Sequence, residues 1–279
     1  LDGNYITRPE RRKRADVVNA FQGQYGVNAN STPGFYSQIN TSHLGEGMHT
    51  LKVVHYSGYG KKIQEREVRF VISNTMTWGI DVSYHQKAIN WNAVKNQGVN
   101  FAIIRVGYYS ESSKTFHLDT RFNEYYNECK RLGIALGGYI YSYEFNPEEA
   151  KHEAEACLQH IRGKSFELPI FLDIEDEKIK NAILNGTTNV NNVTNGAIAF
   201  CNMMNQNGYQ AGVYANKDFF THYLNASVLE QYNIWLAHYT NAPSSDYPGR
   251  YDIWQYTSAG SIPGIDGPVD LNWCFKRYY

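Results

Sequence analysis

Residues 1–77 show the apolar alternation of β-strands and no helical period of any length. The stretch 48–72 predicts two half-buried strands around a glycine-bearing turn, because apolar residues recur there at every second position. Shorter strands are expected over 17–21 and 35–39, with a turn at 31–34. This part of the chain is therefore predicted to be a small all-β module of the immunoglobulin or fibronectin type.

Residues 78–279 instead alternate between patterns typical of strands and of helices. Such alternation predicts a parallel sheet covered by helices. Apolar strands are expected at 79–83, 101–106, 134–141, 170–174 and 210–215, helices at 91–97, 118–132, 147–162 and 194–207, and three further strands without helices at 234–237, 252–256 and 269–271.

Eight strands are enough to close a barrel. The predicted fold of residues 78–279 is thus an α/β, TIM-like barrel of five βα units plus three further strands. The competing fold is an open doubly wound sheet. Such a sheet normally carries a glycine-rich phosphate loop after its first strand, and residues 81–86 do not form one.

The composition narrows the classes of function. A formal net charge of −1 argues against nucleic acid as the main partner, because phosphate binding needs a basic face. No apolar run is long enough to span a membrane. The four cysteines lie far apart, without metal-ligand spacing, and are expected to be free thiols. We expect neither a metal site nor a cofactor.

The strand over 170–174 ends in two carboxylates, Asp173 and Glu175. Because one residue separates them, both side chains point to the same face of a strand, roughly 6–7 Å apart. Two acids in a partly dry barrel mouth cannot both ionise easily, so one pKa rises and that group holds a proton near neutral pH. Cleavage of a glycosidic bond needs one such acid and one stabilising anion.

Two further acids are expected beside this pair. In a closed eight-stranded barrel the last strand lies next to the first, which would bring Asp270 to Asp81 across the seam. Four acids would then ring one cavity. On spacing alone, glycoside hydrolysis competes with binding of calcium or magnesium and with a structural role.

The stretch from Gly79 to Tyr279 resembles the family-25 glycoside hydrolases, the lysozymes of bacteria, their phages and some fungi. A histidine common in the family's third strand is replaced by Ile140. The matching landmarks are Gly79-Ile80-Asp81-Val82-Ser83 with Gln86, Ile89-Asn90-Trp91, Gly137-Gly138-Tyr139-Ile140-Tyr141, Leu168-Pro169 through Asp173-Ile174-Glu175, Gly212-Val213-Tyr214, Trp235-Leu236-Ala237, Trp254-Gln255-Tyr256 and Val269-Asp270-Leu271-Asn272.

The resemblance implies a role for each acid. Glu175 would be the general acid, and Asp173 would orient the substrate acetamido group or stabilise the charge it develops. Asp81 and Asp270 would complete the cluster. The candidates for glycan binding, for each of which core packing is the alternative, are Tyr139, Tyr141, Tyr214, Trp235 and Gln255.

The predicted function is therefore that of a lysozyme, which hydrolyses the β-1,4 bond between N-acetylmuramic acid and N-acetylglucosamine in bacterial peptidoglycan. The alternatives are a chitinase-like acetamido-sugar hydrolase and a non-catalytic cell-wall glycan-binding protein. We expect a secreted or wall-associated protein. Because the chain begins at Leu1, it is interpreted as a processed or shortened product, and a missing leader does not argue for the cytoplasm. Residues 1–77 would be an accessory module whose basic run at 11–14 contacts anionic wall polymers or forms a solvated loop.

Overall fold

A computed structural model describes residues 9–12, 18, 34–36, 39, 41, 44–45, 47–57, 59–72, 76–110, 115–143, 146–240 and 244–279. The chain divides into two compact units, Leu1–Asn74 and Thr75–Tyr279.

The described strands of the N-terminal unit form two antiparallel pairs. Strand β1 (Glu10–Arg12) pairs with β2 (Gly34–Tyr36). Strand β3 (Gly47–Tyr56) pairs with β4 (Lys62–Ile72) along its whole length, so the hairpin expected from the alternation over 48–72 is confirmed. A small β module is thus present, as its apolar pattern indicates.

The described residues of this unit depart from two local patterns. Of the strand expected over 17–21, the structure describes only Val18, which is buried and helical. Two arginines of the basic run, Arg11 and Arg12, lie in the paired strand β1 and not in a loop. The turn expected at 31–34 and the rest of the basic run lie outside the described residues, apart from Gly34 in β2.

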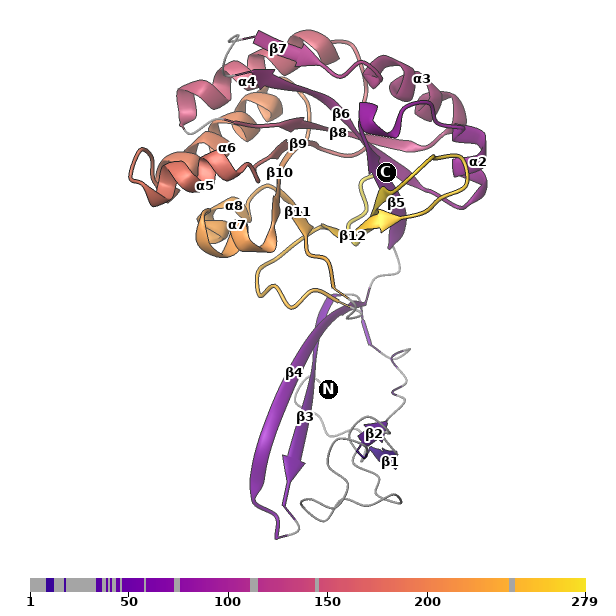
Figure 1. The fold of residues 1–279 in the computed structure, drawn as a ribbon, viewed down its shortest axis with the longest axis vertical. Coiled ribbons are helices and arrows are strands. Elements are labelled where there is room, and N and C mark those ends of the chain that lie inside the picture. The colour runs from indigo at the N-terminus through magenta and orange to yellow at the C-terminus, as the bar shows by residue number, and fades with distance from the viewer. Residues whose placement is uncertain are drawn as a thin grey trace. The chain divides into compact units, whose positions relative to one another are not determined.

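The C-terminal unit contains a closed barrel of eight strands (Figure 1). Seven strands run parallel, and the last is antiparallel to both of its neighbours, the first and the seventh. The predicted α/β barrel is confirmed. In ring order the strands are β5 (Thr77–Val82), β6 (Phe101–Ser110), β8 (Ala135–Tyr141), β9 (Ile170–Asp173), β10 (Ala211–Asn216), β11 (Asn233–Ala237), β12 (Ile253–Gly260) and β13 (Val269–Cys274).

Helices follow the first five barrel strands and cover the outside of the barrel (Figure 1). Asparagine or aspartate side chains cap most of these helices, as at Asn146, which accepts hydrogen bonds from two backbone N–H groups at the start of its helix. The helices are η1 (Tyr84–Gln86), α2 (Trp91–Asn96), α3 (Phe122–Leu132), α4 (Pro147–Ile161), α5 (Glu177–Leu184), α6 (Val190–Gln206), α7 (Lys217–His222) and α8 (Ala226–Leu229).

The start of the helix expected over 118–132 is wrong. Residues Thr115–Leu118 form a ninth strand, β7, which pairs antiparallel with the end of β6 outside the barrel ring. Helix α3 begins only at Phe122. The helices α5, α7 and α8 are additional to those expected from the sequence. No helix in the described part of the chain is long and apolar enough to cross a membrane.

Strand alternation sorts the apolar side chains of this unit into two layers. Phe101, Ile103 and Phe171 pack inside the barrel. Leu172 and Ile174 belong to the larger cluster between strands and helices. Residues of one parity therefore fill the barrel or face its mouth, while residues of the other parity hold the helices. The cysteines, all free and buried, are Cys129, Cys157, Cys201 and Cys274.

Candidate active site

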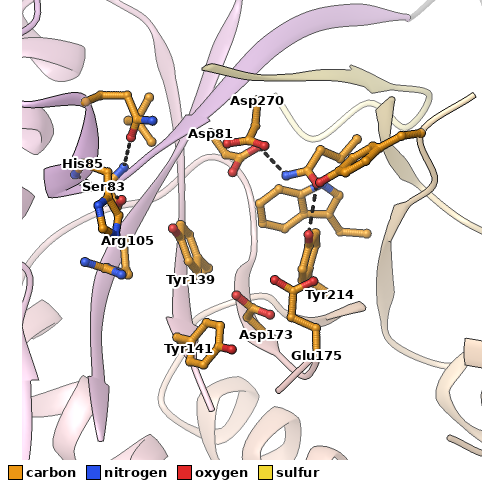
Figure 2. A pocket seen from close by; sticks show the side chains of 15 residues that line it. Asp81, Ser83, His85, Arg105, Tyr139, Tyr141, Asp173, Glu175, Tyr214 and Asp270 are labelled. Atoms are coloured by element: carbon orange, nitrogen blue, oxygen red, sulfur yellow. Dashed lines mark hydrogen bonds between the residues drawn. The ribbon is translucent and has the colours of Figure 1, made fainter. Parts of the chain in front are cut away.

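A cavity of about 240 Å³ opens where the parallel barrel strands end at their carboxyl side. Figure 2 shows the labelled carboxylates and tyrosines around this common space. All nine side chains singled out from the sequence line it, namely Asp81, Tyr139, Tyr141, Asp173, Glu175, Tyr214, Trp235, Gln255 and Asp270.

The barrel seam brings Asp81 and Asp270 together. The two residues are direct register partners in the antiparallel pair of β5 and β13. Because β13 runs against its neighbours, its first residues lie at the end of the barrel where β5 finishes. The juxtaposition expected from barrel closure is therefore observed.

The second pair of acids comes from the end of β9. Asp173 is the last residue of that strand, and Glu175 follows two residues later. Both side chains line the cavity, whereas Leu172 and Ile174 pack outward beneath the helices. Asp173 is buried, and its Oδ1 atom has no hydrogen-bond partner among the described residues. An acceptor in that position is suited to a donor from a bound molecule.

Two amide side chains hold Asp81. Gln255 Nε2 and Asn272 Nδ2 both donate to its Oδ2 atom, at 2.8 and 2.7 Å. All three residues are buried. Two short hydrogen bonds to one carboxylate oxygen favour its ionised form.

Three aromatic side chains orient these amides. Trp235 Nε1 donates to Asn272 Oδ1 at 2.8 Å. The hydroxyls of Tyr214 and Tyr239 donate to Gln255 Oε1 at 3.0 and 2.7 Å. Because each amide oxygen already accepts from a fixed donor, each NH₂ group is directed toward Asp81. Trp235 and Tyr214 also pack edge to face, with ring centroids 4.5 Å apart.

The four acids have perturbed proton affinities. Burial raises the pKa of Asp270 to about 6. Burial, and then the charge of Asp270, raise the pKa of Asp81, while the two amide donors lower it. Burial and the charge of Glu175 raise the pKa of Asp173 well above its ordinary value. Burial also raises the pKa of Glu175. Such a cluster can retain a proton on one acid near neutral pH while another stays ionised.

Several cavity residues are additional to those singled out from the sequence. His85 is exposed and also lines the cavity, although no spacing to a partner residue singles it out in the sequence. Ser83 and Gln86 follow the end of β5, so the rule that placed the acids at strand ends would also have found them. The remaining additions to the lining are Val82, Arg105 and Tyr239.

Asp176 and His117 are not among the residues that line the cavity. Asp176 caps α5 through a hydrogen bond from Lys178 N, and it also accepts from the Tyr141 hydroxyl at 2.9 Å. His117 is exposed and stacks on Tyr108, with ring centroids 5.1 Å apart. Within the described ranges no group of three or more His, Cys, Asp or Glu side chains is arranged to hold a metal ion.

The sequence model of the glycosyl hydrolases family 25 matches residues 80–265. The chain is 26% identical over 195 residues to the "Autolytic lysozyme" of Clostridium acetobutylicum, covering 70% of this chain and 54% of the relative. It is 28% identical over 206 residues to "Lysozyme M1" of Streptomyces globisporus, covering 70% of this chain and 66% of the relative. The chain thus spans about half the length of the first relative.

Two solved structures have a similar fold. The catalytic domain of endolysin ply40 from bacteriophage P40 of Listeria monocytogenes is 27% identical, with a TM-score of 0.59 over 73% of this chain and 95% of that chain. The modular autolysin LytC from Streptococcus pneumoniae is 24% identical, with a TM-score of 0.61 over 79% of this chain and 56% of that chain. At that identity the second likeness concerns the fold alone.

Proposed function

The chain belongs to family 25 of the glycosyl hydrolases, and from this premise we propose that it is a lysozyme acting on bacterial peptidoglycan. The bond hydrolysed would be the β-1,4 linkage between N-acetylmuramic acid and N-acetylglucosamine. The observation that carries the proposal is the ring of four acids, from β5, β9 and β13, around one cavity at the barrel mouth. Both curated relatives described above bear the name lysozyme, which supports the same substrate.

Glu175 is the proposed general acid. It lies just beyond the end of β9, half-buried at the cavity, where burial raises its pKa. A carboxyl group that keeps its proton near neutral pH can protonate the leaving glycosidic oxygen. Glu175 is also less buried than Asp81 and Asp173, so a bound glycan can reach it without opening the barrel.

Asp173 is the proposed partner of the substrate acetamido group. Its unpartnered Oδ1 atom would accept a hydrogen bond from the acetamido N–H and so orient that group beside the sugar carbon under attack. As positive charge develops on the acetamido group and the sugar ring, the carboxylate would stabilise it. This role explains why a buried acid remains without a protein donor on one oxygen.

Asp81 and Asp270 are proposed to set the electrostatics of the site. The two amide donors favour the ionised form of Asp81. When Asp81 is ionised, its negative charge beside the cavity would stabilise positive charge in the transition state. It also helps its neighbours to retain protons, since like charges close together raise each other's pKa.

The aromatic candidates fall into two groups. Trp235 and Tyr214 are buried, and their polar atoms are hydrogen bonded to Asn272 and Gln255, so we assign them to positioning rather than to direct glycan binding. Tyr139 and Tyr141 are half-buried at the cavity and remain candidates for glycan contact. Tyr239, 52% exposed, offers a further ring for a sugar face to stack on.

The cellular setting is part of the same proposal. A peptidoglycan hydrolase acts outside the membrane, so we propose a secreted or wall-associated protein. Residues 1–77 are proposed as an accessory module that contacts anionic wall polymers, with the exposed Arg11 as one point of contact.

The proposal is tested by clearing of purified peptidoglycan by the wild type, Glu175→Gln and Glu177→Gln. Glu177 is a matched control, because it is an exposed glutamate two residues further along the chain, in the first turn of α5. We expect the Glu175 variant to lose activity by about a hundredfold or more and the control to keep it. Failure of the wild type to clear the wall would overturn the proposal, and full activity of Glu175→Gln would remove Glu175 from its role.

A further inference from the structure

Arg105 is the only arginine or lysine among the described residues that line the cavity. It lies on β6, with the same parity as Phe101 and Ile103, whose side chains fill the barrel interior. Figure 2 shows its side chain on the side of the cavity away from Glu175 and Tyr214. A cation at the mouth of so acidic a site needs a physical explanation.

The guanidinium group of Arg105 is held in a fixed orientation. Its Nε donates to Asp119 Oδ2 at 2.8 Å, and the side chains are only 11% and 1% exposed. The group also lies over the rings of Tyr84 and Tyr108, 4.8 and 5.8 Å from their centroids. Stacking of this kind and one charged hydrogen bond restrict the rotamers of the arginine before any ligand arrives.

The hydrogen bond to Asp119 occupies only one edge of the guanidinium group. Among the residues that the structure describes, Asp119 is its only hydrogen-bond partner, and no cavity carboxylate lies within the 4.0 Å of an ion pair. None of the hydrogen bonds of the described residues uses the terminal Nη1 and Nη2 groups of Arg105, which is one of the residues that line the cavity. Two parallel N–H donors in one plane match the two oxygens of a carboxylate.

We propose that Arg105 forms a carboxylate-recognition subsite in the mouth of the barrel. The ligand group would be a carboxylate on the lactyl side of a muramic acid residue, either the lactyl carboxylate itself or a carboxylate of an attached peptide. This inference rests on the proposed function and deepens it. It provides a way to distinguish muramic acid glycans from neutral polymers of N-acetylglucosamine, which carry no charge to meet the arginine.

The experiment is a binding cycle in the Glu175→Gln background, where hydrolysis is suppressed. The full chain with Arg105 or with Arg105→Gln is titrated with a muramic acid oligosaccharide and with the same oligosaccharide after its carboxylates are converted to amides. We expect Arg105→Gln to weaken binding of the charged oligosaccharide by about tenfold. Binding of the amidated oligosaccharide should be unchanged, because no ion pair is lost.

The same cycle on oligosaccharides with and without attached peptides separates the two sources of the carboxylate. A loss only on the peptide-free oligosaccharide indicates the lactyl carboxylate, which is an amide once a peptide is attached, and a loss only with peptides indicates a peptide carboxylate. Either result, or a loss on both, supports the subsite. An equal loss on charged and amidated ligands, or no loss on either, overturns it. Such a result leaves the lysozyme proposal intact, since that proposal is judged by wall clearing with the wild type.

A stability measurement on Arg105→Gln and two further variants serve as controls. Arg105→Gln should still fold, because Asp119 retains hydrogen bonds from the backbone N–H groups of Tyr84 and Arg121. Thermal unfolding of the variant checks this directly.

Arg105→Lys keeps the charge without the planar pair of donors and should recover part of the affinity for the charged ligand. Arg121→Gln, a substitution at an arginine outside the cavity lining, should change neither affinity.

Discussion

At the scale of single residues, the chemistry of the site depends on how its acids are partnered. Asp81 receives two amide donors, whereas one oxygen of Asp173 receives none from the described residues. Burial raises the pKa of both, but hydrogen bonds to the ionised form oppose that shift only at Asp81. Two aspartates that line one cavity therefore differ in how their ionised forms are hydrogen bonded, because their neighbours differ.

Asn272 is expected to control the pH dependence of activity through Asp81. Asn272→Leu removes one donor to Asp81 Oδ2, so the pKa of Asp81 rises further. If ionised Asp81 is needed for activity, the acid limb of the pH profile moves to higher pH, by about one unit. Initial rates of wall clearing across pH 3–9 measure the shift. A lower rate at every pH with an unmoved acid limb would indicate a purely structural role for Asn272.

Among the single residues of the site, the four acids were predictable from the sequence. They stand at strand ends, and closure of the barrel alone places Asp270 beside Asp81. Arg105 was missed although its parity with Phe101 and Ile103 is readable in the sequence, because an arginine within an apolar strand suggests an exposed edge. Tyr239 was missed because it follows the end of β11, where loop conformation and not periodicity decides the direction of a side chain.

At the scale of elements, the period of two along the strands separates the barrel interior from the helix layer. That period and the lengths of the apolar runs were sufficient to predict all eight barrel strands. The short helices α7 and α8, with six and four residues, lack enough turns to show a helical period. Strand β7 has only four residues, and it forms by pairing with the end of β6, a tertiary contact that no local pattern reveals.

Glycine at the interior of β10 is expected to be essential for barrel packing. A Cβ atom on Gly212 would lie 2.4 Å from the backbone oxygen of Asn233 and 2.6 Å from the ring of Phe171. Because a backbone atom cannot move aside as a side chain can, Gly212→Ala should lower the free energy of unfolding by about 1–3 kcal/mol. Denaturant unfolding followed by tryptophan fluorescence provides the measurement. Unchanged stability would mean that the strands adjust at this point without cost.

At the scale of the whole molecule, the acid cluster is expected to lower the free energy of unfolding, although the proposed function requires these acids. Asp270 has its pKa raised from 3.8 to about 6 in the folded protein, because it is partly buried. Below the ordinary pKa the group is protonated in both states and carries no penalty. Between about pH 4 and pH 6 the unfolded chain ionises this group while the folded protein still keeps it protonated, so stability falls over that range and stays lower above it.

Asp270→Asn is therefore expected to stabilise the protein at pH 7 but not at pH 4. At pH 7 the free energy of unfolding should increase by on the order of 2 kcal/mol. The variant should at the same time lose activity, because the acid is part of the proposed site. Melting temperatures of the variant and the wild type at the two pH values give the comparison. An equal change at both pH values would show that packing of the side chain, and not its charge, determines the effect.

The identity of the bond that the wild type cuts tests the central claim most directly. Purified peptidoglycan is digested, the new reducing ends are reduced with borohydride, and the fragments are identified by mass spectrometry. The acid cluster at the mouth of a family-25 barrel predicts reduced muramic acid at the fragment ends. Reduced glucosamine, or no new reducing end at all, would contradict it.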